Sequence, residues 1–354
     1  MTLARGRRRI SATAHSRARS SEREICHVAA RLTAGARSCP ARFPLTARPS
    51  PRYQASVGAV GVSPRGEIMS ALGRALVLVL LSVAVPLGLV RAHASPAAGV
   101  ERMYVMACGE NRTEDVSAWS PGVNVGQPRV FSNHCYLIRH PQGWLLWDTG
   151  NADAIAAHPD GVSGAGGRLL VRMPKTLASQ LKELGVDPMA IKYLALSHMH
   201  PDHTGNANLF TAATLYMQEA EYDAAFGPDA AKYNFNPATY DKLRGNPVVK
   251  LRGDHDVFGD GSVVIKSTPG HTIGHQALLV RLPKTGPVLL SGDLVHFEDN
   301  WVSKRVPARN FDREQSLRTM QAIEAFLAET KATLWINHDK AQSEHIPKAP
   351  ASVE

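Results

Sequence analysis

The sequence predicts an α+β protein in which strands and helices form packed layers, and three observations support this class. Short runs rich in β-branched and aromatic residues at 102–108, 134–140 and 143–150 are typical of strands. Two later segments, 176–186 and 313–330, have apolar residues at helical spacing. Histidine and aspartate residues also stand directly after several of the predicted strands. Such side chains can meet at one edge of a layered sheet.

In the first half of the chain, glycine and proline residues separate the predicted elements. Turns are expected at Pro141 and Gly143, between the second and third strand. The polar stretch 110–128 is rich in glycine and proline and predicts a long loop. Residues 193–197 predict a short buried strand, which leads directly into a group of histidines.

The second half predicts one more sheet and one more long helix. Residues 218–227 have a helical pattern, whereas 228–246 show no clear period. Four strands are predicted, at 262–268, 275–282, 287–293 and 332–337. Four large apolar side chains in this part predict core packing, with the lining of an acyl-chain pocket as the alternative: Met217, Tyr222, Phe226 and Phe235.

The first 94 residues differ in composition from the rest of the chain. Residues 1–68 hold 13 arginines, no lysine and three acidic residues, so they cannot bury enough apolar surface to fold. From Met69 on, an arginine, an apolar run at 75–90 and small residues at 92 and 94 are typical of a secretory signal peptide. We expect translation to begin at Met69, 69–94 to be removed and 95–354 to form one domain. The alternatives are an uncleaved membrane anchor, and a basic tail that binds nucleic acid or a membrane surface.

The positive charge of the chain lies in this leader. Residues 1–94 hold 15 arginines and three acidic residues, a net +12, which leaves 9 − 12 = −3 for residues 95–354. We therefore expect no nucleic-acid partner and no stable membrane association after cleavage. Export predicts a periplasmic or secreted protein. There, Cys108 and Cys135 either form a disulfide or remain two separate buried thiols.

The stretch SHMHPDHTGN, residues 197–206, predicts a metal site. His198 and His200 are two residues apart and are able to bind one ion, while Asp202 and His203 follow a bend at Pro201 and reach a second. Imidazole and carboxylate groups suit zinc, iron, cobalt or manganese. Three further candidates stand where other predicted strands end: His271, Asp293 and His338. Seven ligands are enough for two ions.

These motifs, in this order, resemble the metallo-β-lactamase superfamily. The pattern H-x-H-x-D-H at 198–203 is followed by GH at 270–271, GD at 292–293 and NHD at 337–339. The resemblance spans about residues 102–350. It implies a four-layer αββα sandwich with a dinuclear metal site at the edges of its sheets.

Carried over to this sequence, the resemblance assigns a role to each candidate ligand. It implies that Asp293 bridges two divalent ions, with zinc as the expected metal. The two ligand sets are His198, His200 and His271 for one ion, and Asp202, His203 and His338 for the other. Asp148 matches the early Asp-x-Gly turn of the family, which supports the ligands, and His275 is also expected to support rather than to bind.

Within this superfamily the chain most resembles the N-acyl-homoserine lactone lactonases, which are quorum-quenching enzymes. The segments that carry this resemblance are CYLIRHPQGWLLWDTG (135–150), LALSHMHPDHTGN (194–206), STPGHTIGHQALLV (267–280), LLSGDLVHFEDN (289–300) and LWINHDKAQ (334–342). It implies that a hydroxide bridging the metals opens a lactone ring and that Asp202 passes the proton. The sequence leaves the oligomeric state open, with a homodimer as one alternative.

His296 departs from the pattern of this family. Many members have a tyrosine three residues after the bridging aspartate, where its hydroxyl contacts the carbonyl of the substrate. Imidazole is also able to donate a hydrogen bond or a proton near neutral pH, so we expect His296 to replace that tyrosine as a catalytic residue. The alternative is that His296 only caps its loop.

Other activities of the same fold remain as alternatives. A glyoxalase II-like thioesterase shares GHTIGH and the seven ligands, but the chain after His338 is short for a glutathione-binding helical region. Class B β-lactamases mostly replace at least one of these ligands. An aryl esterase and a non-catalytic metal-binding protein are two further alternatives.

Overall fold

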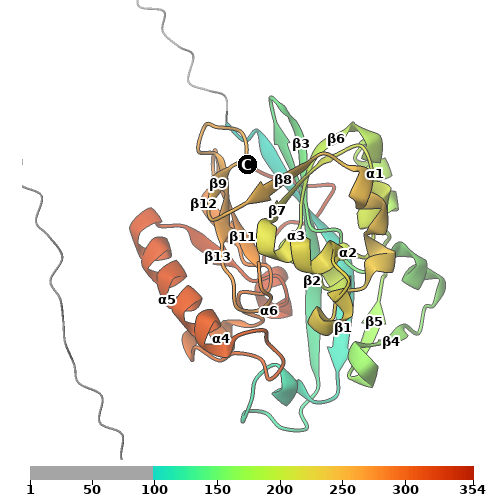
Figure 1. Cartoon of the computed structure of the whole chain (residues 1–354), viewed down its shortest axis with the longest axis vertical. Helices are drawn as coiled ribbons and strands as arrows, with labels where there is room; N and C mark the ends of the chain where they lie inside the picture. The colour runs from blue at the N-terminus through green and yellow to red at the C-terminus, as the bar shows by residue number, and fades with distance from the viewer. Residues whose placement is uncertain (1–98) are drawn as a thin grey trace, which may run out of the picture. The chain divides into compact units, whose positions relative to one another are not determined.

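The computed structural model describes residues 99–354, drawn in colour in Figure 1. The predicted upstream segment 1–68 and the predicted signal peptide 69–94 lie outside these described residues. Among the helices that the structure describes, none combines the length and the apolar character needed to cross a membrane.

The larger of two sheets has nine strands, eight of which lie between residues 102 and 251. In spatial order its strands are β4 (Val162–Gly164), β5 (Leu169–Arg172), β1 (Arg102–Thr113), β2 (Arg129–His140), β3 (Gly143–Trp147), β6 (Ile191–Ala195), β7 (Thr214–Gln218) and β8 (Val248–Leu251), with β14 (Ser352–Val353) paired to β1. β1, β2 and β3 are antiparallel neighbours, whereas β3, β6, β7 and β8 run parallel. Parallel strands end at the same edge of a sheet, so the loops after β3 and β6 meet there.

The smaller sheet has five strands from the second half of the chain. Its order is β13 (Thr333–Trp335), β12 (Gly286–Leu290), β11 (Gln276–Leu282), β10 (Val263–Ser267) and β9 (His255–Asp256). β12 and β13 are parallel, and the other neighbours are antiparallel. The loops that follow β10, β12 and β13 carry His271, Asp293 and His338.

Helices cover the outer faces of both sheets (Figure 1). One apolar cluster lies between the two sheets, with Trp147 and Leu278 among its fully buried side chains. A second cluster packs α1 (Leu177–Glu183) and α3 (Glu219–Phe226) against the larger sheet, and a third packs α5 (Arg313–Thr330) against the smaller one. The order helix, sheet, sheet, helix confirms the predicted αββα sandwich.

Helices α1 and α5 begin at side-chain caps that the sequence contains. The Thr176 side chain accepts a hydrogen bond from the N–H of Ser179, and that of Asp312 accepts one from the N–H of Gln315. Each cap satisfies a backbone donor that has no partner inside its helix. The shorter helices are α2 (Pro201–Thr204), α4 (Glu298–Val302) and α6 (Lys340–Ser343).

The predicted loop 110–128 is wrong at its start, because β1 continues to Thr113. The polar residues 110–112 pair with β2 on one side and with β5 on the other. Two neighbouring strands satisfy the backbone groups of this stretch, and this pairing outweighs its low strand propensity. Strand β7 was not predicted either. Its five residues end directly before α3, so no turn residue separates the strand from the helix.

Cys108 and Cys135 form a disulfide between β1 and β2. The strand register shifts between Ala107 and Gly109, so Cys108 is the extra residue of a bulge. Both cysteines are fully buried, and their Cα atoms lie 5.7 Å apart. Of the two alternatives that the sequence left open, the structure therefore shows the disulfide.

Candidate metal centre

The histidine-rich loop begins where β6 ends, beside the loop after β3. Asp148 has a positive φ of 58° and accepts a hydrogen bond from the backbone N–H of Ser197 at 2.6 Å. His200 directly precedes α2, and Pro201 occupies the first position of that helix. Proline fits this position because its fixed φ is helical and its missing N–H is not needed there. The loop therefore turns sharply and directs its side chains to one side.

Four side chains form the first group of candidate ligands. His200 Nδ1 lies 2.9 Å from His198 Nε2 and 3.1 Å from His271 Nε2. Oδ2 of Asp293 lies 3.2 Å from His271 Nε2 and 3.7 Å from His198 Nε2. These four donor atoms are close enough to one another to hold one cation.

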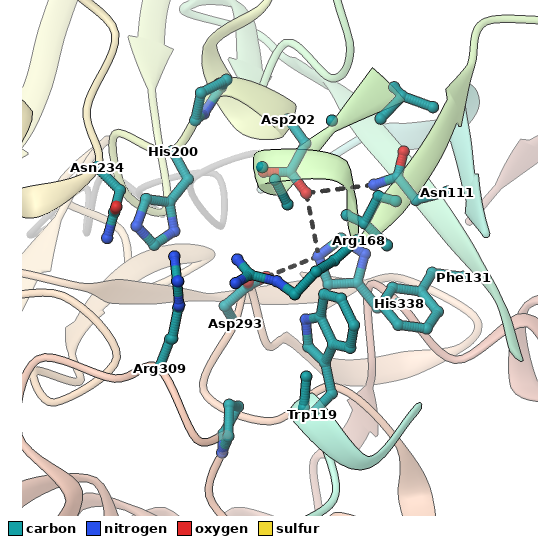
Figure 2. Close-up of a pocket in the computed structure, with 18 of the residues that line it drawn as sticks. Asn111, Trp119, Phe131, Arg168, His200, Asp202, Asn234, Asp293, Arg309 and His338 are labelled. Carbon is teal, nitrogen blue, oxygen red and sulfur yellow. Dashed lines mark hydrogen bonds and ion pairs between the residues drawn. The ribbon is translucent and has the colours of Figure 1, made fainter. Parts of the chain in front are cut away.

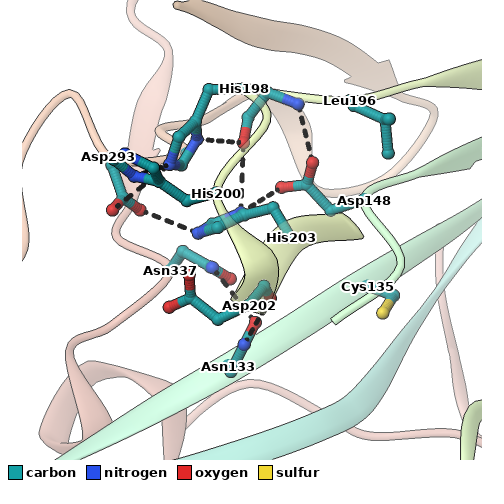
Figure 3. A network of polar contacts seen from close by, with 12 residues as sticks. Asn133, Cys135, Asp148, Leu196, His198, His200, Asp202, His203, Asp293 and Asn337 are labelled. Carbon is teal, nitrogen blue, oxygen red and sulfur yellow. Dashed lines mark hydrogen bonds and ion pairs between the residues drawn. The ribbon is translucent and has the colours of Figure 1, made fainter. Parts of the chain in front are cut away.

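Asp202, His203 and His338 form the second group, on the other side of Asp293. Oδ1 of Asp293 lies 3.1 Å from His203 Nε2 and 3.0 Å from His338 Nε2. Asp202 Oδ2 lies 3.8 Å from His338 Nε2. Asp293 thus presents one carboxylate oxygen to each group, as a bridging ligand would (Figure 3). The structure brings all seven predicted ligands together, and ligation itself stays a prediction.

These donor atoms fit two divalent cations. His203 Nε2 and Asp293 Oδ1 are buried and have no hydrogen-bond partner among the described residues. Ligands about 2.0–2.2 Å from a tetrahedral zinc ion lie roughly 3.3–3.6 Å apart. This separation is near the 3.0–3.8 Å between the nitrogen and oxygen donors seen here.

The remaining ring nitrogen of two candidate ligands is held by an acceptor. His203 Nδ1 lies 2.9 Å from the Asp148 carboxylate, and His338 Nδ1 lies 2.8 Å from the backbone oxygen of Ser132. Since an ionised carboxylate and a carbonyl oxygen only accept, each Nδ1 carries the proton. When either ring is neutral, its Nε2 therefore carries the lone pair and faces Asp293, and this is the tautomer that binds a metal.

The position of Asp293 depends on Gly292 and His275, which lie next to strands β12 and β11 of the smaller sheet. Gly292 has a φ of 51°, and a Cβ atom there would come within 2.6 Å of the Cβ of Ser197, so only glycine fits. His275 Nε2 accepts the N–H of Asp293 at 2.9 Å, while His275 Nδ1 lies 3.1 Å from the carbonyl oxygen of Thr268. The Thr268 hydroxyl also lies 2.8 Å from Nδ1, so both nitrogens of His275 are occupied, in agreement with the expected supporting role.

Glu221 is a buried acid that the sequence analysis did not identify. Its carboxylate accepts one hydrogen bond from the N–H of Met199 at 3.0 Å and another from the N–H of Gly274 at 2.8 Å. Met199 lies in the histidine-rich loop and Gly274 lies in the loop of His271, so one side chain connects two ligand loops. Burial raises the pKa of Glu221 to about 7. The only signal in the sequence was an acidic residue on the same side of its helix as the buried Ala225.

Burial and neighbouring charges divide the candidate histidines into two classes. Burial lowers the pKa of His198 well below its usual value and that of His200 to about 3. Burial also opposes the protonation of His203 and His338, but the negative charge of Asp293 outweighs it and raises both pKa values. Protons therefore compete with a cation for the second group more than for the first.

His296 lies next to the carboxylate of Asp293. Its Nε2 is 3.2 Å from Asp293 Oδ2, and its Nδ1 is buried with no hydrogen-bond partner among the described residues. Together with Asp293 and His338, His296 forms a third set of atoms at ligand spacing. At the start of α4 the N–H of Glu298 is bound by Asp339 rather than by His296.

A cavity of 1160 Å³ opens above the two groups (Figure 2). The candidate ligands at its base are His200, Asp202, His271, Asp293 and His338, with His296 beside them. Its apolar walls include Trp119, Phe131, Leu169, Tyr233 and Phe311. Four side chains considered for this wall belong instead to the core under α3, which confirms their predicted core packing: Met217, Tyr222, Phe226 and Phe235.

An αββα sandwich with two adjoining sets of histidine and aspartate ligands at its sheet edges defines the class of metal-dependent hydrolases with a two-ion site. The family model of the metallo-beta-lactamase superfamily matches residues 128–332. The chain therefore belongs to the metallo-beta-lactamase superfamily, as its motifs predicted.

The most similar relatives include proteins described as N-acyl homoserine lactonases. The enzyme AttM of Rhizobium johnstonii is 36% identical over 224 residues, which are 61% of this chain and 84% of the relative. A lactonase of Bacillus sp is 30% identical over 69% of this chain and 95% of its own length. A solved N-acyl homoserine lactone hydrolase, with N-hexanoyl-L-homoserine bound at its catalytic metal center, matches with a TM-score of 0.64. That match has 25% identity and covers 72% of this chain and all of the other.

Proposed function

We propose that this protein hydrolyses the ring ester of N-acyl-homoserine lactones and so destroys quorum-sensing signals. The observation that carries the proposal is the pair of ligand groups around Asp293, placed at the base of a large cavity. The similarity to AttM, and to a solved relative that holds a ring-opened product at its metal centre, supports a lactone as the substrate. The cavity of 1160 Å³ exceeds the ~300–1,000 Å³ of ordinary small-molecule sites and has room for an acyl chain.

In this proposal, each residue at the base of the cavity has its own role in the reaction. Two divalent cations, for which we propose zinc, supply a Lewis acid and a water molecule of lowered pKa when they are bound. Burial lowers the pKa of His296, so its ring is neutral and carries a single N–H proton. With the Asp293 carboxylate engaged by the cations, Nε2 of His296 would donate this proton in a hydrogen bond to the carbonyl oxygen of the substrate. Asp202 takes the proton that the attacking water gives up and passes it to the leaving ring oxygen, so the ring opens to a carboxyl group and a hydroxyl group. Asn111 donates a hydrogen bond to the Asp202 carboxylate at 3.4 Å.

We also propose that the protein is exported to the periplasm or the medium. The disulfide between Cys108 and Cys135 supports an oxidising compartment, because such bonds are rare in reducing ones. The apolar run at 75–90, preceded by an arginine and followed by small residues, supports a signal peptide. Sequencing of the amino terminus of the exported protein tests this, and we expect a first residue near Ser95.

Four substrates, offered in parallel to the zinc-loaded chain, separate the candidate activities. We expect turnover of N-hexanoyl-homoserine lactone, and much slower turnover of a cephalosporin, S-lactoylglutathione and an aryl ester. The variant His296→Phe should lose roughly 10²-fold in kcat, the typical effect of removing one donor to a developing oxyanion, while His296→Tyr should retain most activity. An untouched lactone beside rapid turnover of another substrate would show that the proposal is wrong.

A further inference from the structure

Two arginine side chains point into the cavity from opposite loops (Figure 2). Arg168 directly precedes β5 at the edge of the larger sheet, and Arg309 lies in the loop between α4 and α5. Burial and the nearby charge of Arg309 lower the pKa of Arg168. Two like charges therefore line the same cavity.

No carboxylate balances these two charges among the residues that the structure describes. Acidic side chains in the lining of the cavity are Asp202 and Asp293, which belong to the candidate metal centre. Lys232 also lines the wall, but it pairs with Asp229 at 2.8 Å. The described arginines that do form ion pairs are Arg112, Arg129, Arg139, Arg252 and Arg318. Two bound divalent ions would make the cavity more positive still. This contrasts with residues 95–354 as a whole, whose net charge is −3.

The backbone around Arg309 is held at several points, so this guanidinium starts from a fixed base. The N–H of Ala308 donates to the carbonyl oxygen of Ala118 at 2.9 Å. The side chain of Asn310 donates to the carbonyl oxygen of Gly270 at 2.7 Å. These contacts tie the residues on both sides of Arg309 to two other walls of the cavity.

Arg168 has a similar support on its own side of the cavity. Leu169, the next residue, pairs with Gly164 in the β4–β5 hairpin. The side chain of Leu169 also packs against the buried cluster of Val116, Phe131 and Phe297. A pair of supported guanidinium groups that lack carboxylate partners is the arrangement that proteins use to bind carboxylate ligands.

We propose that Arg168 and Arg309 form a subsite for a carboxylate at the far end of the acyl group, so that the preferred substrate is a lactone with an anionic acyl chain. This inference rests on the proposed lactonase function and narrows its substrate class. A neutral acyl chain would leave both guanidinium groups without a carboxylate partner, whereas a terminal carboxylate accepts hydrogen bonds from both. The lactone ring then lies at the metal centre and the carboxylate lies at the rim.

A matched pair of substrates tests the subsite. N-adipoyl-homoserine lactone and N-hexanoyl-homoserine lactone have acyl chains of equal length, and only the first ends in a carboxylate. For the zinc-loaded protein at low salt we expect kcat/KM to be about tenfold higher for the adipoyl compound, the effect of one good charged hydrogen bond. This ratio should fall toward one in both Arg168→Gln and Arg309→Gln. It should stay unchanged in Arg318→Gln, which removes an exposed arginine of α5.

The ratio of the two substrates cancels any general loss of folded protein in a variant. A ratio of one or less in the parent protein overturns the subsite, and so does a ratio that persists in either arginine variant. If neither lactone is hydrolysed, the proposed function fails instead, and calorimetric binding of adipate then decides the inference. Weaker binding of adipate to both arginine variants supports the subsite, and equal binding to the parent and either variant overturns it.

Discussion

The backbone N–H of Asp293 donates a hydrogen bond to Nε2 of His275, and the two atoms lie 2.9 Å apart in the interior of the protein. Nδ1 of the same ring lies 3.1 Å from the carbonyl oxygen of Thr268, which only accepts. His275 is therefore neutral, with its proton on Nδ1, and burial lowers its pKa well below the usual value. Through this ring, β10 and β11 determine where the backbone of Asp293 lies between the two ligand groups.

We expect His275→Ala to weaken zinc binding although His275 is not a ligand. The change leaves the N–H of Asp293 buried without an acceptor, which costs about 1–3 kcal/mol of unfolding free energy. Loss of such a supporting contact typically lowers metal affinity about 10–100-fold. Zinc titration with a competing chelator measures this affinity. His345→Ala, at an exposed histidine outside both groups, serves as the control, and equal affinities of the two variants would contradict the assigned role.

Asp148→Asn tests how the ring of His203 is held. Asparagine tolerates the positive φ of 58° at this position, so the backbone of the turn should persist. In the parent protein, the two oxygens of Asp148 accept the N–H of Ser197 and the Nδ1 proton of His203. The variant has a single amide oxygen in place of these two. We expect about 10–100-fold weaker binding of one zinc ion of the two. The control is Asp187→Asn, at the exposed cap of a surface turn.

Glu221 should make the stability of the metal-free protein depend on pH. Its folded-state pKa of about 7 lies above the value near 4.5 expected in the unfolded chain. The unfolded chain therefore releases this proton first, and the unfolding free energy should fall on the order of 3 kcal/mol as the pH rises from 4.5 through 7. Urea unfolding in the presence of a chelator, at several pH values, measures this change.

Glu221→Gln removes the ionisation and should flatten this part of the pH profile, while the titrations of the histidines remain common to both proteins. The variant should also bind zinc more weakly, because Met199 and Gly274 donate to different oxygens of Glu221, and glutamine replaces one of these oxygens with an NH2 donor. Parallel pH profiles of the parent and the variant would refute the assignment. Glu329→Gln, on the exposed side of α5, is a suitable control.

Zinc uptake should release protons and should strengthen as the pH rises. The pKa values of His203 and His338 are raised because the Asp293 carboxylate outweighs the effect of burial. Both rings therefore retain protons above pH 6.5, and a cation has to displace them. Calorimetry in two buffers with different heats of ionisation counts the released protons. Binding heats that do not depend on the buffer would show that neither ring is protonated in the metal-free protein.

Much of this site was predictable, because its candidate ligands are close together in the sequence or directly follow predicted strands. His198, His200, Asp202 and His203 are close together in the sequence and directly follow a recognisable strand. Residue types, spacing and strand ends are local properties, and a strand delivers the next residues to the edge of its sheet. The αββα class and the long helix α5 were predictable for the same reason, since hydrophobic period and capping residues act over short stretches.

Local patterns in the sequence were enough to predict the candidate ligands, the layered fold and the family. The pairing of Cys108 with Cys135, the link that Glu221 makes between two ligand loops and the two arginines of the cavity wall became visible in the folded protein. These features depend on distances between segments that are far apart along the chain, and no local pattern encodes them. Packing of the two sheets sets those distances, and burial then makes each buried charge or unpaired donor costly enough to require a partner.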